Sequence, residues 1–462
     1  MEFTWKNKDK SIYIDYDNEL KLLWVPKESI IINEIREFLP LKMSTTNSKK
    51  FILYNSLILG DNVFALNSLK NMLKEFRDDE KVKFVYIDPP YNTFNPELSY
   101  KDNLLHEEWL TFMQDRLERL KEIVRTDGII CIQIDDREYA RLYLLMIELF
   151  GEKNLKSIVV KMSESSGLKM QSIKNGGIPK LKEYLIIAKM DGIQGFHFDP
   201  IVKKQIDPEY KIFLKNFTLK DKEKFNYYQN KEKITQDDLN ELDQICKKIE
   251  LVSLNKVFDE HNINNNLKTN FFKENAWRIC RTASSSSIFK LAEEKKAKLS
   301  EPQQIFTVLS RKGLVYFVKS DYTPKARKPR VQILFANEHL TTPLGDLWTD
   351  IKTTGLEFEG NVDFKNGKKP EKLIRRLIKG TTDEGDLVLD LFGGSGTTAC
   401  IALESNRKFI SIEVNREIFN ISMKRIENKL AELDKQNFLQ EINVNYYKIG
   451  SSKHSNLNLS KI

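Results

Sequence analysis

The chain has 462 residues and a formal net charge of +8 at pH 7, which leaves room for two or three domains and a sizeable core. The four cysteines, Cys131, Cys246, Cys280 and Cys400, lie far apart, so we expect neither a metal site nor a disulfide framework, in keeping with a reducing cytosol. No secretory signal is apparent and no apolar run approaches the roughly 20 residues of a membrane span, so we expect a cytoplasmic protein without a membrane partner.

Residues 1–50 are predicted to form an N-terminal appendage, with residues 29–39 as a short amphipathic helix. From residue 51 to residue 190, short apolar runs alternate with amphipathic stretches. Strands are predicted near residues 53–59, 83–88, 129–134, 156–161 and 184–189. Helices are predicted at residues 61–76, 109–125 and 137–150. This alternation is typical of a parallel sheet with helices on both faces.

The sequence Asp88-Pro89-Pro90-Tyr91 directly follows one of these apolar runs, and two prolines cannot continue a strand ladder. The pattern places an acid and an aromatic ring on a rigid turn at the carboxyl end of a strand, where open α/β sheets bind ligands. Asp88 and the carbonyl of Pro89 could each accept an N–H of an exocyclic amino group, and Tyr91 could stack on a planar base. The four residues alone are equally compatible with an ordinary turn.

The region from residue 191 to residue 342 interrupts the alternation and carries the excess of positive charge. Between residues 201 and 340 there are 27 Lys and Arg but only 18 Asp and Glu. A lysine-rich composition can be plain solvated surface, but its concentration in one region favours the binding of a polyanion.

A second motif, Asp-Leu-Phe-Gly-Gly-Ser-Gly-Thr, occupies residues 390–397 between an apolar run and an apolar helix. A strand, a glycine-rich turn and a helix in this order open a nucleotide-type βα unit, in which the glycines let the backbone approach a ligand. Glu413 follows a second predicted strand, 17 residues past Gly396, where an acid can hold ribose hydroxyls. Asp61, also at a strand end, is expected either to cap a helix or to contact the cofactor.

Together these segments resemble the β class of amino-group DNA methyltransferases, in which an Asp-Pro-Pro-Tyr motif precedes a Phe-x-Gly-x-Gly cofactor motif. Within that class the chain looks most like the modification (Mod) subunits of type III restriction systems. The resemblance covers roughly residues 50–190 and 343–425, and Lys182 stands where a His is more usual. Further matching stretches are residues 59–66, 91–93, 128–136, 182–189 and 368–374.

The resemblance implies an α/β fold with a doubly wound, mostly parallel sheet of the S-adenosylmethionine-dependent methyltransferase type, with circularly permuted motif order. It also implies a division of the chain into functional parts. These are the N-terminal appendage (1–50), a catalytic half (51–190), an inserted target-recognition domain (191–342), a cofactor-binding half (343–425), and a C-terminal helix and tail (426–462).

The same resemblance implies roles for individual residues. The catalytic residues would be Asp88, Pro89, Pro90 and Tyr91. S-adenosyl-L-methionine would be held by Asp61, Lys369, Pro370, Asp390, Phe392, Gly394, Gly396, Thr397 and Glu413. Contacts to DNA phosphates or to guanine are expected from Arg278, Arg281, Lys325, Arg327, Lys328 and Arg330.

The implied reaction is methylation of N6 of an adenine flipped out of double-stranded DNA, as part of a restriction-modification system. Two alternatives stay open: methylation of cytosine N4, although related enzymes of that kind usually carry Ser in place of Asp88, and a non-catalytic DNA-specificity subunit. The family implies a restriction (Res) subunit as a partner, and often a homodimer. The sequence holds no Gly-x-x-x-x-Gly-Lys-Ser/Thr loop for ATP, and a solitary methyltransferase stays possible.

Overall fold

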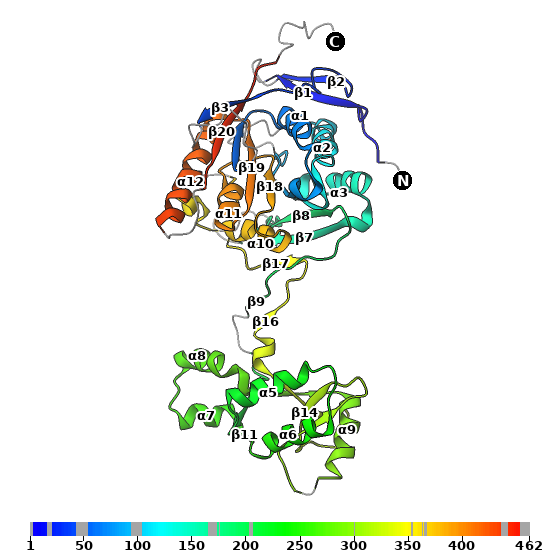
Figure 1. Cartoon of the computed structure of the whole chain (residues 1–462), viewed down its shortest axis with the longest axis vertical. Coiled ribbons are helices and arrows are strands. Elements are labelled where there is room, and N and C mark those ends of the chain that lie inside the picture. Colours follow the sequence, from blue (N-terminus) through cyan, green and yellow to red (C-terminus); the bar gives the residue numbers. More distant parts are fainter. Residues whose placement is uncertain are drawn as a thin grey trace. The chain divides into compact units, whose positions relative to one another are not determined.

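The computed structural model describes residues 3–15, 21–42, 54–93, 104–164, 173–174, 176–202, 207–299, 301–352, 354–362, 364, 367–435 and 442–452. The chain divides into two compact units (Figure 1). Unit 1 comprises residues 1–199 and 344–462, and unit 2 comprises residues 200–343. None of the helices in the described part of the chain combines the length and apolarity needed to cross a membrane.

Unit 1 is built on a ten-stranded sheet with the strand order β17-β7-β8-β6-β5-β18-β19-β4-β20-β3. The central strands run parallel to one another: β6 (Val124–Ile134), β5 (Val82–Ile87), β18 (Leu387–Asp390), β19 (Lys408–Glu413), β4 (Ser56–Leu59) and β20 (Asn445–Ile449). Antiparallel pairs flank them, formed by β8 (Lys182–Lys189) with both β6 and β7 (Leu155–Lys161), and by β20 with β3 (Phe38–Lys42). Edge strand β17 (Leu347–Trp348) runs parallel to β7. The predicted mostly parallel α/β fold is confirmed.

Helices cover both faces of this sheet (Figure 1). One face carries α1 (Asn62–Leu73), α2 (His106–Leu120) and α3 (Asp136–Phe150), and the other α10 (Glu371–Thr381), α11 (Thr397–Glu404) and α12 (Arg416–Lys435). Alternate side chains of β5 point to opposite faces, as the two-residue period of a strand requires: Val85 and Ile87 join the first core, and Phe84 and Tyr86 the second.

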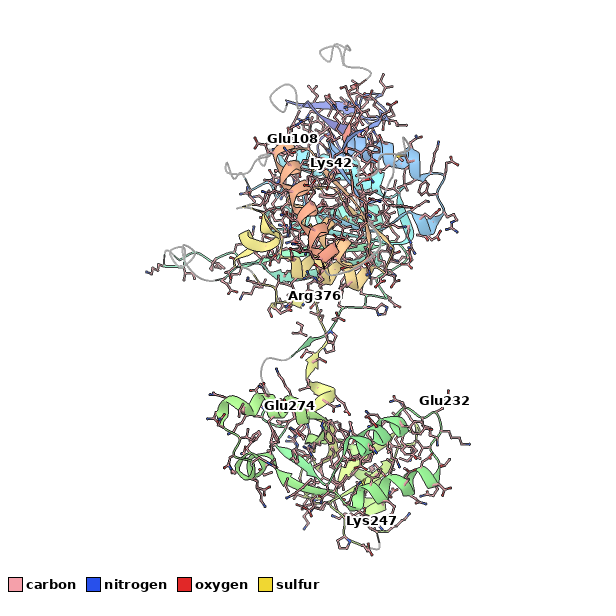
Figure 2. All side chains as sticks on the ribbon, turned by 60° about the vertical axis from the view of Figure 1, so that its left-hand side comes forward. Lys42, Glu108, Glu232, Lys247, Glu274 and Arg376 are labelled. Atoms are coloured by element: carbon pink, nitrogen blue, oxygen red, sulfur yellow. The ribbon has the colours of Figure 1, made fainter. Side chains whose placement is uncertain are left out.

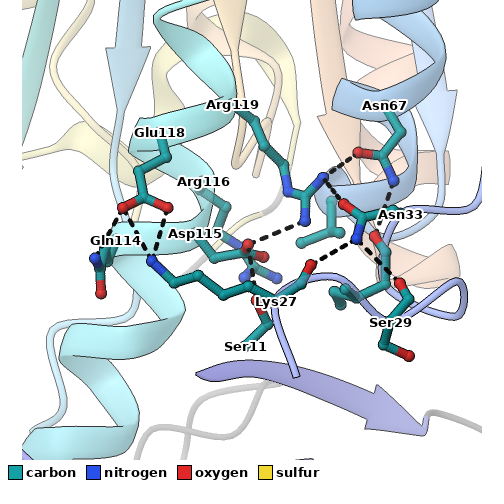
Figure 3. Close-up of polar contacts among 12 residues, drawn as sticks. Ser11, Lys27, Ser29, Asn33, Asn67, Gln114, Asp115, Arg116, Glu118 and Arg119 are labelled. Atoms are coloured by element: carbon teal, nitrogen blue, oxygen red, sulfur yellow. Dashed lines mark hydrogen bonds and ion pairs between the residues drawn. The ribbon is translucent and has the colours of Figure 1, made fainter. Parts of the chain in front are cut away.

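Ser11, Lys27 and Asn33 of the N-terminal segment belong to a network of polar contacts with α1 and α2 (Figure 3). The Arg119 guanidinium donates to Asn33 at 3.2 Å, to Asp115 at 3.0 Å and to Asn67. The predicted helix at residues 29–39 is wrong. Instead the Asn33 amide donates to the carbonyl oxygens of Lys27 and Ser29, which folds this stretch into turns before β3 begins. An N-terminal hairpin of β1 (Lys10–Asp15) and β2 (Lys21–Pro26) precedes them.

The predicted helix at 109–125 also ends early, because Val124 already belongs to β6 and pairs with Val82 of β5. Short 3-10 helices complete the connections, at Asp78–Glu80, Glu152–Asn154, Ala276–Arg278, Ala336–His339 and Leu356–Asn361. Residues 191–199 belong to unit 1, where the Phe198 ring lies 5.2 Å from that of Trp348.

Unit 2 contains a six-stranded antiparallel sheet with the order β11-β10-β12-β15-β14-β13. Its strands are β10 (Ile212–Lys215), β11 (Glu250–Ser253), β12 (Ile279–Ser284), β13 (Ile305–Leu309), β14 (Val315–Lys319) and β15 (Arg330–Phe335). Its helices are α5 (Leu219–Gln229), α6 (Gln236–Lys247), α7 (Leu254–Glu260), α8 (Asn265–Asn275) and α9 (Ser286–Lys296). Lys247 at the end of α6 and Glu274 near the end of α8 are labelled in Figure 2.

Stacked aromatic rings form much of the core of unit 2. The rings of Phe225 and Phe317 lie 3.8 Å apart, and Phe335 packs between Phe217 and Phe317. At its two ends, β9 (Ile201–Val202) pairs antiparallel with β16 (Thr341–Thr342). Unit 2 is therefore an insertion between β8 and β17, and its entering and leaving segments lie side by side.

Candidate active site

Acidic residues line the carboxyl edge of the parallel strands. Asp88 follows β5, Asp390 ends β18, Glu413 ends β19 and Asp61 follows β4. The strands are direct neighbours in this order, since Asp390 pairs with both Tyr86 and Ser411, and Glu413 pairs with Leu59. The two motifs, about 300 residues apart in the sequence, thus lie next to each other at one edge of the sheet.

The turn after β5 is held from both sides. The Trp109 indole N–H donates to the carbonyl oxygen of Pro90 at 2.7 Å. Asn92 has the positive φ of 58° that Asn tolerates better than most residues, and its buried amide donates to Glu138 at 2.8 Å. Arg137 of α3 donates to the Asn92 carbonyl at 2.5 Å. The Asp-Pro-Pro-Tyr turn is therefore fixed by α2 and α3 as well as by its own prolines.

Lys369, which precedes α10, reaches this turn. Its Nζ lies 3.0 Å from Asp88 Oδ1 and 3.7 Å from Glu183 Oε2, and it donates to the Tyr91 hydroxyl at 2.9 Å. The same ammonium lies 4.6 Å from the centre of the Tyr91 ring. Lys369 was predicted to contact the cofactor. The structure places it against Asp88 and Tyr91 of the Asp-Pro-Pro-Tyr turn and against Glu183 of β8.

A chain of hydrogen bonds continues beneath the turn. The Tyr91 hydroxyl donates to Glu183 Oε2 at 2.9 Å, and the Gln133 amide donates to the same oxygen at 2.6 Å. The Tyr86 hydroxyl in turn donates to Gln133 Oε1 at 2.6 Å. Strands β5, β6 and β8 each contribute to this chain, so the orientation of Tyr91 depends on the packing of all three strands.

The protonation of these groups follows from burial and from one shared cation. Burial raises the pKa of Asp88 above its ordinary value, Lys369 opposes that rise, and Glu183 adds to it. Burial would lower the pKa of Lys369, but Asp88 and Glu183 outweigh burial and raise it. Burial would raise the pKa of Glu183, but Lys369 and the hydrogen bonds from Gln133 and Tyr91 lower it. Of the two carboxylates, Asp88 therefore takes up a proton more easily than Glu183 as the pH falls.

The glycine-rich loop folds tightly between β18 and α11. The N–H of Phe392 donates to Asp390 Oδ1 at 3.0 Å, and the N–H of Gly394 donates to Glu413 Oε2 at 2.9 Å. Gly396 has a φ of 77°, and a Cβ there would lie 2.4 Å from the Ser422 hydroxyl of α12. At Gly394, with a φ of 50°, a Cβ would meet only the Phe392 carbonyl at 3.7 Å. The loop therefore presents backbone at Gly394 to open space, which is where a ligand can approach it.

Two carboxylates next to this loop are buried and have raised pKa values. Burial raises the pKa of Asp390 to about 7, and hydrogen bonds from Thr398 and Phe392 only partly oppose it. Burial also raises the pKa of Glu413, although it accepts the N–H groups of Gly394 and Asn415. Within the described residues, no Lys or Arg forms an ion pair with either carboxylate. Such a site suits a ligand that brings its own positive charge and hydroxyl donors.

The other predicted cofactor residues surround the same loop. Asp61 caps α1 by accepting the N–H of Val63 at 2.8 Å, and the adjoining Asn62 amide donates to the carbonyl of Leu391. Pro370 is the N-cap residue of α10, and the Phe392 ring packs 6.0 Å from that of Phe112. Thr397 begins α11, and its hydroxyl accepts from Arg425 at 2.7 Å.

The predicted DNA contacts in unit 2 fall into three groups. Arg278 donates to Asn275 and lies over the rings of Phe213 and Trp277, so much of its guanidinium is already occupied inside the unit. Arg281 and Arg330 both contact Glu209, Arg281 at 2.5 Å and Arg330 through two oxygens at 3.2 and 3.0 Å. The remaining predicted residues, Lys325, Arg327 and Lys328, lie in the turn between β14 and β15, and their side chains are exposed.

Comparison with known proteins identifies the family of this fold and site. Residues 82–424 match the N6_N4_Mtase family, described as "DNA methylase", and this match spans both motifs. The chain belongs to this DNA methylase family. The match runs from β5 into α12 and includes unit 2.

Among curated proteins, this DNA methylase is similar to the "Probable type III restriction-modification enzyme HindVI Mod subunit" of Haemophilus influenzae. The two are 32% identical over 412 residues, which cover 81% of this chain and 50% of that protein. The EcoPI Mod subunit of Escherichia phage P1 is 27% identical over 445 residues, covering 81% of this chain and 62% of that protein. This DNA methylase thus spans about half to three fifths of the length of these relatives, and the predicted resemblance to Mod subunits is confirmed.

Among solved structures, the cytosine-N4-specific PvuII DNA methyltransferase is 14% identical with a TM-score of 0.38, over 80% of this chain and 86% of that one.

Several residues of the site were missed from the sequence of this DNA methylase. Glu183 and Gln133 are polar side chains within apolar strands, a pattern that signals a buried hydrogen-bond network. Trp109 was predicted only as the start of a helix; its ring lies in the core, and its indole N–H donates to the Asp-Pro-Pro-Tyr turn. Arg425 lies on α12, 1% exposed, and no sequence motif marks it.

Proposed function

We propose that this chain transfers a methyl group from S-adenosyl-L-methionine to N6 of an adenine in double-stranded DNA. The observation that carries the proposal is the position of Asp88 and Tyr91 beside the glycine-rich loop, on the neighbouring strands β5 and β18. An acceptor and an aromatic ring for a base are thereby adjacent to a loop whose backbone is open to a ligand. The membership of the DNA methylase family supports the same reaction.

The residues around the glycine-rich loop fit the proposed methyl donor. Its ammonium and sulfonium would bring positive charge to a site where Asp390 and Glu413 lack a cationic partner among the described residues, and its ribose hydroxyls can donate to Glu413. Gly394 leaves room for close approach of the ligand to the backbone. S-adenosyl-L-methionine supplies an electrophilic methyl group bonded to a positively charged sulfur.

The catalytic turn would prepare the nitrogen of the base. Ionised Asp88 accepts one N–H of the adenine amine and the Pro89 carbonyl accepts the other, which turns the nitrogen lone pair toward the methyl group. Tyr91 stacks on the flipped base. The lone pair forms the new N–C bond while the S–C bonding pair stays on sulfur, and the nitrogen then loses a proton, for which Asp88 is the nearest acceptor. Because the turn is rigid, its acceptors need little reorganisation in the transition state.

Unit 2 would read the target sequence, with the exposed basic turn of Lys325, Arg327 and Lys328 against the phosphate backbone. Because the similar curated proteins are named as Mod subunits of restriction-modification enzymes, we further propose that this chain acts in such a system in the cytoplasm. A restriction subunit and a second copy of the chain are its proposed partners.

The test is transfer of labelled methyl groups from S-adenosyl-L-methionine to mixed genomic DNA, followed by separation of the nucleosides. We expect label on N6-methyladenine with the wild-type protein and its loss with Asp88→Ala. Asp321→Ala, which removes a carboxylate that is 96% exposed on unit 2, serves as the matched control and should transfer normally. Label on N4-methylcytosine, or transfer that survives in Asp88→Ala, would refute the proposed reaction.

A further inference from the structure

Lys369 occupies a position that a role in cofactor binding does not explain. Its side chain is 12% exposed, and its ammonium contacts Asp88 at 3.0 Å and the Tyr91 hydroxyl at 2.9 Å. It also lies 4.6 Å from the centre of the Tyr91 ring. All of these partners belong to the turn proposed to hold the target base. A buried ammonium must find its stabilisation in such partners, since water is largely excluded.

The two carboxylate oxygens of Asp88 are not equivalent. Oδ1, which faces Lys369, is fully buried, whereas the side chain as a whole keeps 19% of its surface exposed. The polar atom left for a ligand is therefore Oδ2. An ionised carboxylate has acceptor sites on both oxygens, so Asp88 can face Lys369 with Oδ1 and accept a substrate N–H with Oδ2 at the same time.

We infer that Lys369 is a positioning residue for methyl transfer, which holds the Asp88 carboxylate ionised and oriented and fixes the hydroxyl end of Tyr91. This inference rests on the proposed function of the site. The ammonium touches neither of the reacting atoms and acts only through Asp88 and Tyr91. An amine that donates an N–H to Asp88 needs a charged acceptor, and the ammonium favours that charged form even though the carboxylate is buried.

Glu183 has the opposite effect on the same carboxylate. It lies 3.7 Å from the Lys369 ammonium and competes with Asp88 for it. The groups that act on Asp88 are thus Lys369 from the segment before α10, Glu183 from β8, and Tyr91 from its own turn. Asp390 of β18 and Tyr86 of β5 are the further titratable groups with which Asp88 interacts. Removing the cation should favour the protonated form of Asp88, and removing the Glu183 charge should favour the ionised form.

The experiment measures kcat between about pH 5 and pH 8 at saturating S-adenosyl-L-methionine and DNA, together with the Kd of S-adenosyl-L-methionine by calorimetry. The variants are Lys369→Met, Lys369→Arg and Glu183→Gln in the full chain. Glu183→Gln keeps an amide oxygen that can accept from Gln133 and Tyr91. The control is Lys372→Met, which removes the same charge in the first turn of α10, where the ammonium pairs with Asp350 at 2.7 Å.

We expect Lys369→Met to lower kcat by about 100-fold and to move the acidic limb of the profile up by about one pH unit. Lys369→Arg should restore the position of the limb, and Glu183→Gln should move the limb in the opposite direction, toward lower pH. The Kd of S-adenosyl-L-methionine should change less than about threefold in each variant, and Lys372→Met should match the wild type.

A loss of cofactor affinity in Lys369→Met with an unshifted limb would overturn the inference and return Lys369 to the cofactor site. The inference would also be overturned if Lys369→Met left the acidic limb of the kcat–pH profile unshifted and bound DNA more tightly. Lys369 would then only occupy the volume that the target base takes on binding. If Lys369→Met does not fold, the inference is still tested by Glu183→Gln, in which the acidic limb of the kcat–pH profile should move toward lower pH. Failure of the proposed function is recognised separately, because the wild-type protein itself would then transfer no methyl group.

Discussion

The indole N–H of Trp109 donates to the carbonyl oxygen of Pro90 across 2.7 Å, and so ties the catalytic turn to α2. Trp109 is otherwise a core residue with no exposed surface. Its hydrogen bond links that helix to the backbone between Asp88 and Tyr91. The rigidity of the acceptors in this turn therefore depends on a side chain that touches no substrate.

Trp109→Phe removes this hydrogen bond and keeps an aromatic ring in the core. We expect kcat for methyl transfer to fall about tenfold, because a neutral hydrogen bond contributes about 1 kcal/mol and the freed carbonyl lets the turn move. The matched control is Trp5→Phe, which removes an indole bond to the Thr111 hydroxyl of the same helix and leaves the Pro90 carbonyl with its donor. Equal losses of kcat in the two variants would contradict the assigned role.

Asp390→Asn should stabilise the protein while it weakens cofactor binding. The pKa of Asp390 is raised to about 7 by burial, so between the ordinary carboxyl pKa of about 4 and pH 7 the folded state keeps a proton that the unfolded chain has already lost, and stability falls as the pH rises. A raised carboxyl pKa means stability that is present at low pH and lost as the pH rises through about 7. The amide never ionises, so the expected gain is roughly 2–4 kcal/mol at pH 8 and smaller at pH 5.

This is measured by urea unfolding at the two pH values, with a parallel titration of S-adenosyl-L-methionine. Glu384→Gln, an exposed carboxylate on the approach to β18, is the control and should leave both quantities unchanged. A variant that is less stable than the wild type at pH 8 would show that Asp390 is not held under strain by its surroundings.

Arg425→Met should destabilise unit 1 and weaken cofactor binding together. The Arg425 guanidinium is buried and donates to the Ser395 and Thr397 hydroxyls at 3.0 and 2.7 Å, and to Glu371 at 2.7 Å. Loss of this buried cation leaves Glu371 with the more distant Arg375 guanidinium, 3.7 Å away, and leaves two buried hydroxyls without their donor, which costs about 2–4 kcal/mol. Lys424→Met at the exposed neighbouring position should stay within about 0.5 kcal/mol of the wild type. Unfolding curves and cofactor titrations of the pair test this, and equal curves would exclude the bridging role.

Glu209→Gln should strengthen DNA binding. The Glu209 carboxylate accepts hydrogen bonds from both Arg281 and Arg330, and so occupies the place where a DNA phosphate could bind the two arginines. These hydrogen bonds, first of all that from Arg330, lower the pKa of Glu209 to about 2. The carboxylate therefore stays ionised throughout the range of any assay, and only substitution removes its charge. We expect a several-fold lower Kd for duplex DNA at about 50 mM salt and a steeper salt dependence.

The control for this comparison is Glu274→Gln, an exposed carboxylate on α8 of the same unit (Figure 2). If both variants bind DNA equally, the effect is one of net charge and the two arginines do not form a phosphate site.

The elements around the site could be predicted because their periodicity is local. Helix α3 was predicted at 137–150 and runs from Asp136 to Phe150, and the strand that carries the catalytic turn was predicted within one residue at each end. Residues 29–39 show why the same reasoning can fail. Their helical spacing of apolar side chains is real, but the Asn67 amide of α1 binds the carbonyls of Ile32 and Glu34, and this tertiary contact favours turns.

The partners of charged side chains could not be predicted in the same way. Lys369 and Tyr91 lie 278 residues apart, and their contact depends on the strand order and on the path of the chain into α10. Arg278 looked like a surface cation from its neighbours in the sequence, but a packed pair of aromatic rings and Asn275 take up its guanidinium. Which cation stays available to a ligand is decided by three-dimensional packing.

The pairing of β9 with β16 has a consequence for how such proteins diversify. Val202 pairs with Thr341 and Ile201 with Thr342, so the first and last residues of unit 2 lie side by side. Neighbouring strands are separated by only about 5 Å, so a different domain with similarly spaced ends could replace residues 200–343 without moving β8 or β17. Under the proposed function, in which unit 2 reads the target sequence, specificity could be exchanged by recombination in nature or by grafting in the laboratory, while the strands of unit 1 keep their order.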